Sequence, residues 1–218
     1  ARFLERQADG LVVYAPNAQA FAEIGAGSNT FEGGAVTGTT ADLPAIRDLG
    51  LSTGRFFDIR EQQQGAFVAV IGASVGESLF PASDPLGQDI RIAGRRFLVI
   101  GVQDRLGTAA GASLDRYVFI PIVAFERVFG APRTLQIFGK ASEGHLPVVG
   151  EDRARISLRA RRGLRPGEED TFDVLTPEAA RDFVQVLSTR ISGAAVPITL
   201  MALLAAIVVV TNTVLVSV

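Results

Sequence analysis

Residues 67–102, FVAVIGASVGESLFPASDPLGQDIRIAGRRFLVIGV, decide the fold of this chain. The stretch begins with an apolar run at Phe67–Ile71, which predicts a buried strand, and continues into a helical pattern at Ser74–Leu79. Two alternating segments follow at Asp89–Ile92 and Phe97–Val102, and the short glycine-containing connection between them predicts a β-hairpin. A strand, a helix and a hairpin in succession predict a mixed fold of the α+β class.

The same two periodicities extend over most of the remaining chain. Further strands are predicted at Leu11–Tyr14, Ala35–Thr37, Tyr117–Ile120 and Leu135–Gly139. Further helices are predicted at Asn17–Ile24, Leu43–Leu49, Ile122–Phe129 and Val149–Arg161. The glycine-rich segment Gly25–Gly38 is interpreted as an exposed loop, and Asp104–Ser113 as a second flexible connection.

Composition excludes several classes of function. With 218 residues and 48% hydrophobic side chains, the chain can bury a substantial core. Its 21 basic and 23 acidic residues give a net charge of -2, which lacks the positive excess of a nucleic-acid-binding protein. Because the chain has no cysteine and one histidine, its composition excludes disulfides, thiolate ligands and a zinc site built on several histidines.

The C-terminal stretch 191–218 contains no charged residue and consists mainly of leucine, isoleucine, valine and alanine. About 20 apolar residues cross a hydrocarbon core of about 30 Å, so residues 194–218 predict one transmembrane helix. A buried core helix is the alternative, although such helices rarely run this long without a polar face. Because the chain starts without a signal-peptide pattern and ends within the apolar run, we expect a longer protein with a transmembrane helix upstream.

Residues 176–193 predict a helix that leads into the apolar stretch. Thr176 is a good N-cap residue, and Pro177 suits the first helical position. An apolar face recurs at helical spacing and consists of Phe183, Val186, Leu187 and Ile191. We interpret the segment as a juxtamembrane stalk helix, and a plain connector fits the same pattern.

One motif has the form of a catalytic site. Gly72-Ala73-Ser74-Val75-Gly76 fits the nucleophile elbow Gly-x-Ser-x-Gly, between a predicted strand and a predicted helix. A serine nucleophile needs a histidine base and a carboxylate, which leaves His145 with Asp104 or Asp115. A tight strand-to-helix turn explains the same small residues without catalysis, and this is the interpretation we favour.

Short motifs in a fixed order resemble the MacB-like periplasmic core domain. They are VTGT at 36–39, IRDL at 46–49, GRFF at 54–57, VAVIG at 68–72, LFP at 79–81, DPLG at 84–87, IRI at 90–92, FLVIGV at 97–102 and VFIP at 118–121. A further similar stretch runs from Leu158 to Phe172, where the histidine usual in the family near residues 161–163 is absent. Each motif is short, but their joint order and spacing are specific.

The resemblance implies a domain on the periplasmic side of the bacterial inner membrane, between the first two transmembrane helices of an FtsX-like permease. It implies a porter-like α/β part at 1–66 and 105–175, an inserted β-rich subdomain at 67–104, and residues 1–193 outside the membrane. The residues expected to fix turns and links in this fold are Gly54, Arg55, Phe56, Gly72, Phe80, Pro81, Asp84, Pro85, Gly87, Gly101 and Pro121.

The resemblance also implies a function without catalysis or a cofactor in this chain. ATP would be bound by a cytoplasmic ABC ATPase, and its motion would pass through the permease to export or extract a substrate. Expected partners are that ATPase, a second permease copy and a periplasmic adaptor. The alternatives are a non-transporting binding or signalling module that regulates a partner such as a cell-wall hydrolase, and a membrane-anchored serine hydrolase.

Overall fold

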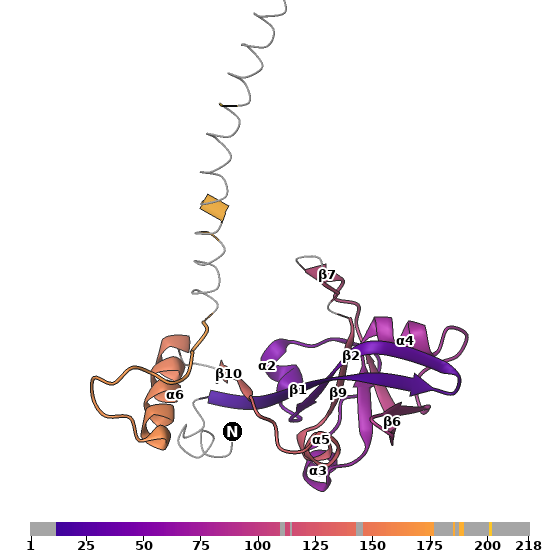
Figure 1. Ribbon diagram of the computed structural model, residues 1–218, viewed down its shortest axis with the longest axis horizontal. Coiled ribbons are helices and arrows are strands. Elements are labelled where there is room, and N and C mark those ends of the chain that lie inside the picture. Colours follow the sequence, from indigo (N-terminus) through magenta and orange to yellow (C-terminus); the bar gives the residue numbers. More distant parts are fainter. Residues whose placement is uncertain are drawn as a thin grey trace, which may run out of the picture. The chain divides into compact units, whose positions relative to one another are not determined.

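The computed structural model describes residues 12–109, 112–113, 115–142 and 146–176, together with the single residues 185, 188, 189 and 201 (Figure 1). The chain divides into two compact units, residues 1–164 and residues 165–218. All regular elements with assigned bounds lie in the first unit. The four single residues of the second unit have helical backbone.

Strands and short helices alternate through the first unit. The strands are β1 Val12–Ala26, β2 Asn29–Thr39, β3 Leu51–Gly54, β4 Val68–Ile71, β5 Asp89–Ile92, β6 Arg95–Gln103, β7 Thr108–Ala109, β8 Ala112–Ser113, β9 Tyr117–Pro121 and β10 Gln136–Ala141. The helices are α2 Leu43–Arg47, α3 Ile59–Gln64, α4 Ala73–Leu79, α5 Ile122–Phe129 and α6 Pro147–Arg162. The predicted hairpin at 89–102 is present, with the two-residue turn Ala93-Gly94 between β5 and β6.

Eight strands form one sheet in the order β10-β1-β2-β9-β4-β6-β3, and β5 pairs with both β6 and the far end of β1. The pairs β2–β9 and β4–β6 are parallel, and the other pairs in this sheet are antiparallel. Because β5 joins β6 to β1, the hydrogen-bonded strands close a ring that contains β1, β2, β9, β4, β6 and β5. A register shift between Ala22 and Ile24 bends β1 toward β5.

The two faces of the sheet carry separate apolar cores, because successive side chains of a strand point to opposite faces. In β9, Val118 and Ile120 belong to the first core, whereas Phe119 belongs to the second. Helices α4 and α5 cover the first core, and α2 and the segment before α3 cover the second. A third, small cluster joins Val12 and Tyr14 of β1 to α6.

Two predictions for the N-terminal third are wrong. Asn17–Ile24 is not a helix but part of β1. The expected loop at Gly25–Gly38 forms the end of β1, a turn at Gly27-Ser28 and most of β2, of which only Ala35–Thr37 was predicted as a strand. The alanine, glutamine and glutamate of this segment favour a helix locally. Pairing with β10, β2 and β5 overrides that preference, because it satisfies the backbone on both edges of β1.

The strands of segment 67–104 do not form a sheet of their own. Its strands β4 and β6 lie in the middle of the shared sheet, and the unit that contains them extends to residue 164. The sequence shows β-rich character in this segment, but the partners of its strands are distant in the chain. β4 pairs with β9 and β5 pairs with β1, which merges the segment into the surrounding domain.

The predicted stalk and membrane helices fall almost entirely outside the described residues. This holds for the stalk-face residues Phe183, Val186, Leu187 and Ile191 and for nearly all of 194–218. Within the part of the chain that the structure describes, no helix has the length and apolar character needed to cross a membrane.

Candidate functional site

Three of the residues expected to fix the fold meet where β3 pairs with β6. Gly54 lies opposite Gly101, and the Arg55 N–H donates to the Ile100 carbonyl at 2.9 Å. Gly54 has φ +78°, and a Cβ added there would lie 2.7 Å from Leu86 Cδ2 and 2.8 Å from Gly101 Cα. Gly101 is equally restricted, since its Cβ would press on the Arg55 carbonyl. Glycine is therefore required on both strands.

The DPLG motif forms a turn that fastens this junction to the hairpin. The Asp84 Oδ1 atom accepts the Leu86 N–H at 3.0 Å, and Gly87, with φ +75°, donates its N–H to the Val99 carbonyl at 2.9 Å. Pro85 lies inside the same turn, which places Leu86 against Gly54. The turn thus links the end of α4 to β6.

Four other motif residues mark the ends of helices, whereas Phe56 lies between β3 and α3 and packs against the second core. Gly72 precedes α4 and donates its N–H to the Tyr117 carbonyl at 2.8 Å, with no room for a Cβ beside the Asp115 backbone. Phe80 is the C-cap of α4 and is followed by the exposed Pro81. Pro121 ends β9 and precedes α5. These residues position α4 and α5 over the first core.

An ion pair supports the segment between β3 and α3. The Nη1 and Nη2 atoms of Arg55 each donate to the Glu61 carboxylate at 2.7 Å. The Asp58 side chain caps α3 by accepting the N–H groups of Arg60 and Glu61 at 2.8 Å. The Glu61 carboxylate also accepts the Asp58 N–H at 2.9 Å, which completes a capping box. The Arg55 hydrogen bond, followed by that from Asp58 N–H, lowers the pKa of Glu61 below its ordinary value of 4.5.

We expect Glu61→Gln to lower the free energy of unfolding by about 0.5–1 kcal/mol near neutral pH, since Arg55 is largely exposed. A lowered pKa in the folded chain means that the ionised carboxylate stabilises the fold above pH 4.5. That contribution is lost as the pH falls below 4.5 through the lowered pKa, so the difference between wild type and variant shrinks there. Urea unfolding at a series of pH values measures the difference in unfolding free energy between wild type and variant. Glu32→Gln, at an exposed carboxylate, is the control. A difference that stays constant from about pH 3 to pH 7 would contradict the assignment.

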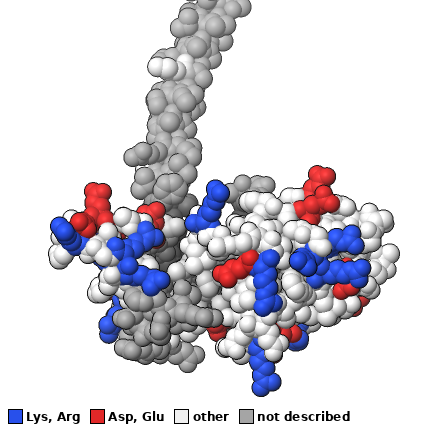
Figure 2. Space-filling view, turned by 60° about the horizontal axis from the view of Figure 1, so that its bottom comes forward, with Lys and Arg blue, Asp and Glu red and all other residues white. Residues whose placement is uncertain are grey.

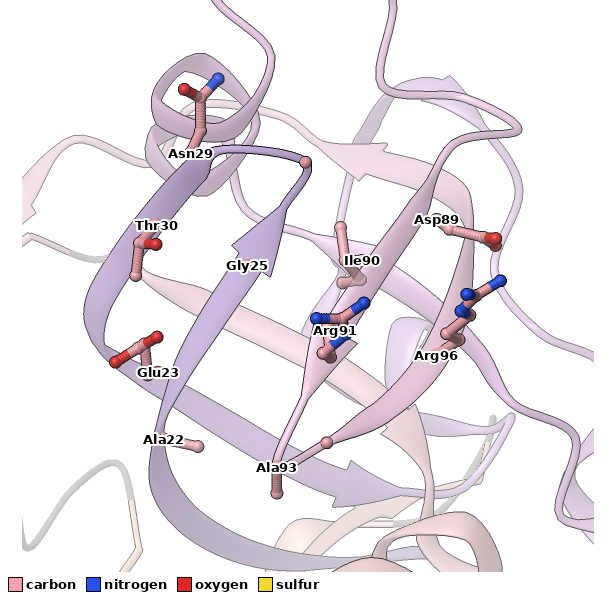
Figure 3. Close-up of a pocket in the computed structure, with 12 residues that line it drawn as sticks. Ala22, Glu23, Gly25, Asn29, Thr30, Asp89, Ile90, Arg91, Ala93 and Arg96 are labelled. Carbon is pink, nitrogen blue, oxygen red and sulfur yellow. The ribbon is translucent and has the colours of Figure 1, made fainter.

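An open groove of about 560 Å³ lies between the β1–β2 hairpin and the β5–β6 hairpin (Figure 3). It is lined by Ala22, Glu23, Gly25, Gly27, Asn29, Thr30, Asp89, Ile90, Arg91, Ala93, Gly94 and Arg96. Figure 3 shows Glu23 on the β1 side and the two arginines on the hairpin side. The groove exists because β5 pairs with the bent end of β1 at Ile24 and Gly25.

The groove is charged rather than apolar. Arg91 lies directly opposite Arg96, so two guanidinium groups are cross-strand neighbours, with Asp89 on the same face two residues away. Such a pair can hold a carboxylate or phosphate group between its guanidinium groups. Over the face drawn in Figure 2, acidic and basic side chains are interspersed, in keeping with the net charge of -2.

Comparison with known families decides the classification. The model of the MacB-like periplasmic core domain matches residues 1–155. The chain belongs to this family. Matching relatives include the macrolide export ATP-binding/permease protein MacB of Rhodospirillum rubrum, 35% identical over 59% of this chain, and that of Bdellovibrio bacteriovorus, 40% identical over 40%. The match covers 20% of the first relative and 14% of the second, so the chain spans about a fifth or less of their length.

Solved structures share the fold of this MacB-like domain. The periplasmic region of MacB from Actinobacillus actinomycetemcomitans matches with a TM-score of 0.70 at 18% identity, over 84% of this chain and 81% of that one. The extracellular domain of the noncanonic ABC-type transporter YknZ from Gram-positive bacteria matches with a TM-score of 0.63 at 17% identity, over 75% and 84%. The family and the mixed α/β fold expected from the motifs are confirmed.

Within the MacB-like domain, the serine motif directly follows β4, with Gly72 as the N-cap of α4 and Ser74 in the first turn of that helix. Asp115, one of the two candidate acids, is 3% exposed, and its carboxylate accepts the N–H groups of Leu106 at 2.6 Å and Gly107 at 3.1 Å. It therefore holds the connection before β7 in place. His145, the candidate base, lies outside the described residues.

Sequence reasoning missed the groove. The alternation of Asp89, Ile90 and Arg91 indicates a polar face on β5, and this signal was available. No such signal was available for the opposite wall of the groove, because the segment containing Glu23 was predicted to be helical. A strand prediction for that segment would have placed Glu23 on the hairpin side of the sheet.

Proposed function

We propose that this chain is the extracytoplasmic segment of an ABC transporter permease of the MacB type. The observation that carries the proposal is the family match over residues 1–155, together with a fold shared with periplasmic and extracellular transporter domains. In this proposal the domain performs no chemistry and binds no cofactor. A cytoplasmic ABC ATPase, in the same chain or in a separate subunit, binds the ATP.

The proposed mechanism is mechanical. ATP binding brings the ATPase domains together, the membrane helices shift, and this domain moves against that of a second permease copy. A domain that transmits motion must be internally stiff, and a sheet packed on both faces with closed pairing through β5 supports this role. The movement would drive an extracytoplasmic substrate toward a periplasmic adaptor.

Membrane attachment belongs to the same proposal. The uncharged segment 194–218 would form the transmembrane helix, and 176–193 the stalk helix that connects it to the domain. Residues 1–193 would then lie on the periplasmic side of the inner membrane. The stalk-face residues Phe183, Val186, Leu187 and Ile191 would pack against neighbouring helices.

The experiment that tests the proposal is isolation of the full-length protein from membranes in mild detergent, with mass spectrometry and an ATPase assay. We expect an ABC ATPase, either encoded in the same chain or recovered with it, and ATP turnover. Recovery without an ATPase or turnover, together with stable capture of one extracytoplasmic protein, would overturn transport and favour the binding and signalling alternative.

A further inference from the structure

A second, smaller cavity lies on the sheet face of the second core. Its volume is about 130 Å³, and strands β1, β2, β9 and β10, the end of β6 and the end of α2 all contribute to it. The lining residues are Asn17, Gln19, Thr37, Arg47, Leu49, Gln103, Leu106, Tyr117, Phe119, Gln136 and Phe138. Four of them carry side-chain amides. They gather where the apolar packing of this face ends.

The register of the sheet brings these amides together. Gln19 of β1 lies opposite Thr37 of β2, which in turn lies opposite Phe119 of β9, so the three side chains form one row on one face. Asn17 is two residues before Gln19 and lies opposite Gln136 of β10, which extends the cluster on the same face. Strands β10, β1, β2 and β9 thus build this row and its extension, which do not depend on a loop.

Two of these residues carry buried amide atoms without a hydrogen-bond partner. Asn17 is 8% exposed and Gln103 is 2% exposed. Among the described residues, nothing hydrogen-bonds Asn17 Oδ1 or either amide atom of Gln103. Buried side-chain amides are nearly always hydrogen-bonded, because their desolvation is otherwise uncompensated. The cavity therefore contains buried polar atoms that a ligand with complementary hydrogen-bonding groups could satisfy.

The unpartnered atoms define that complement. Asn17 Oδ1 and one atom of Gln103 accept hydrogen bonds, and the other atom of Gln103 donates them, whichever way the Gln103 amide is turned. A primary carboxamide offers two N–H donors and one carbonyl acceptor, which matches this set. No carboxylate lines the cavity to balance a cation. The one charged residue in the lining is Arg47, whose guanidinium lies over the Phe138 ring, and a carboxylate ligand would leave Asn17 Oδ1 and the Gln103 oxygen without a donor.

Size and walls fit the same group. At about 30 Å³ per water molecule, the cavity has the volume of about four waters, enough for a carboxamide and its methylene groups. The Tyr117 and Phe119 rings stack with centroids 6.2 Å apart and planes 12° apart, and they form a flat apolar wall. The Arg47 guanidinium lies over the Phe138 ring at 5.0 Å. Leu106 lines the cavity yet is 47% exposed, so it lies at the opening.

We propose that this cavity binds the uncharged carboxamide side chain of a peptide, with Gln103 and Asn17 as its hydrogen-bonding partners. The exposed Leu106 at the opening contacts the peptide next to the inserted side chain. This inference does not rest on the transport mechanism, since it concerns a site within the folded domain.

The chain itself provides the reporter for a test. It contains two tyrosines, Tyr14 and Tyr117, and only Tyr117 lines the cavity. After incorporation of 3-fluorotyrosine into the 218-residue chain in mild detergent, two fluorine resonances are expected. Titration with N-acetylglutamine methylamide should shift the Tyr117 resonance to saturation and leave that of Tyr14 in place. The isosteric glutamate compound is the charged control and should bind at least about tenfold more weakly, because its carboxylate has no N–H group to donate to Asn17 Oδ1.

Two outcomes of this titration would overturn the proposal. An unmoved Tyr117 resonance would mean that the cavity holds only water. Equal affinity for propanamide would mean that the site recognises a free small amide and not a peptide. Tyr14→Phe assigns the resonances, because it leaves Tyr117 as the single tyrosine.

Gln103→Met separates ligand binding from a structural role. Methionine keeps the shape of the side chain and removes both unpartnered atoms, so we expect a higher melting temperature and at least about tenfold weaker binding of the glutamine compound. Gln64→Met, at an exposed position of α3 outside the cavity, should leave the affinity unchanged. A lower melting temperature for Gln103→Met would overturn the proposal, because it would show that the amide has partners within the folded chain.

Discussion

Gly54→Ala is expected to lower the free energy of unfolding by about 2–4 kcal/mol, against about 1 kcal/mol for Gly94→Ala. The two glycines form a matched pair, with φ of +78° and +79°. In both alanine variants the positive φ lowers the stability of the folded chain, because alanine adopts this conformation less readily than glycine. Only at Gly54 does the new methyl group also press on the Ile100 carbonyl, Leu86 and Gly101, whereas nothing lies within 4 Å at Gly94.

Urea unfolding followed by circular dichroism measures both variants under the same conditions. The difference between them isolates the steric contribution of the β3–β6 junction, because the backbone contribution is shared. Equal losses of stability at Gly54 and Gly94 would contradict the close packing of β3, the DPLG turn and β6.

Phe97→Ala is expected to lower the free energy of unfolding by about 3–5 kcal/mol. Phe97 is fully buried in the first core, and its ring meets that of Phe67 edge-on with centroids 5.2 Å apart. Removing the ring leaves a cavity in the first core. Small domains are stable by about 5–15 kcal/mol, so the loss is a large share of the total.

Phe21→Ala is the matched control, since Phe21 lies in β1 and is 74% exposed. We expect a loss of under about 1 kcal/mol there. Thermal and urea unfolding compare the two alanine variants directly. A Phe97 variant as stable as the Phe21 variant would show that the hairpin does not pack on the first core as described.

The elements that local sequence determines were predictable. The β5–β6 hairpin follows from two alternating segments around Ala93-Gly94, and α4 follows from a buried strand that ends at Ile71 and is followed by the N-cap Gly72. Strand β1 was not predictable, because its alanines and Glu23 favour a helix and its strand conformation depends on three distant partners. The pairing of β4 and β5 with strands outside 67–104 was not predictable for the same reason.

The candidate site likewise has parts that were predictable from the sequence and parts that were not. The motif glycines Gly54 and Gly101 were identified from the sequence, and the structure brings them face to face across β3 and β6. The groove and the amide cavity were not identified, because each is assembled from strands far apart in the chain. Gln103 and Asn17 are ordinary polar residues in the sequence, and only their burial without partners distinguishes them.

The most direct test of the proposed function is a distance measurement across the assembled transporter. This chain contains no cysteine, so a cysteine at the exposed Ser83 provides one spin-label position in each copy of it. The full-length protein with its ATPase is reconstituted in lipid, and the distance between the two labels is measured without nucleotide and in an ATP-trapped state. We predict two different distance distributions. The same distribution in both states, in a preparation that turns over ATP, would contradict the proposal that this domain transmits ATP-driven motion.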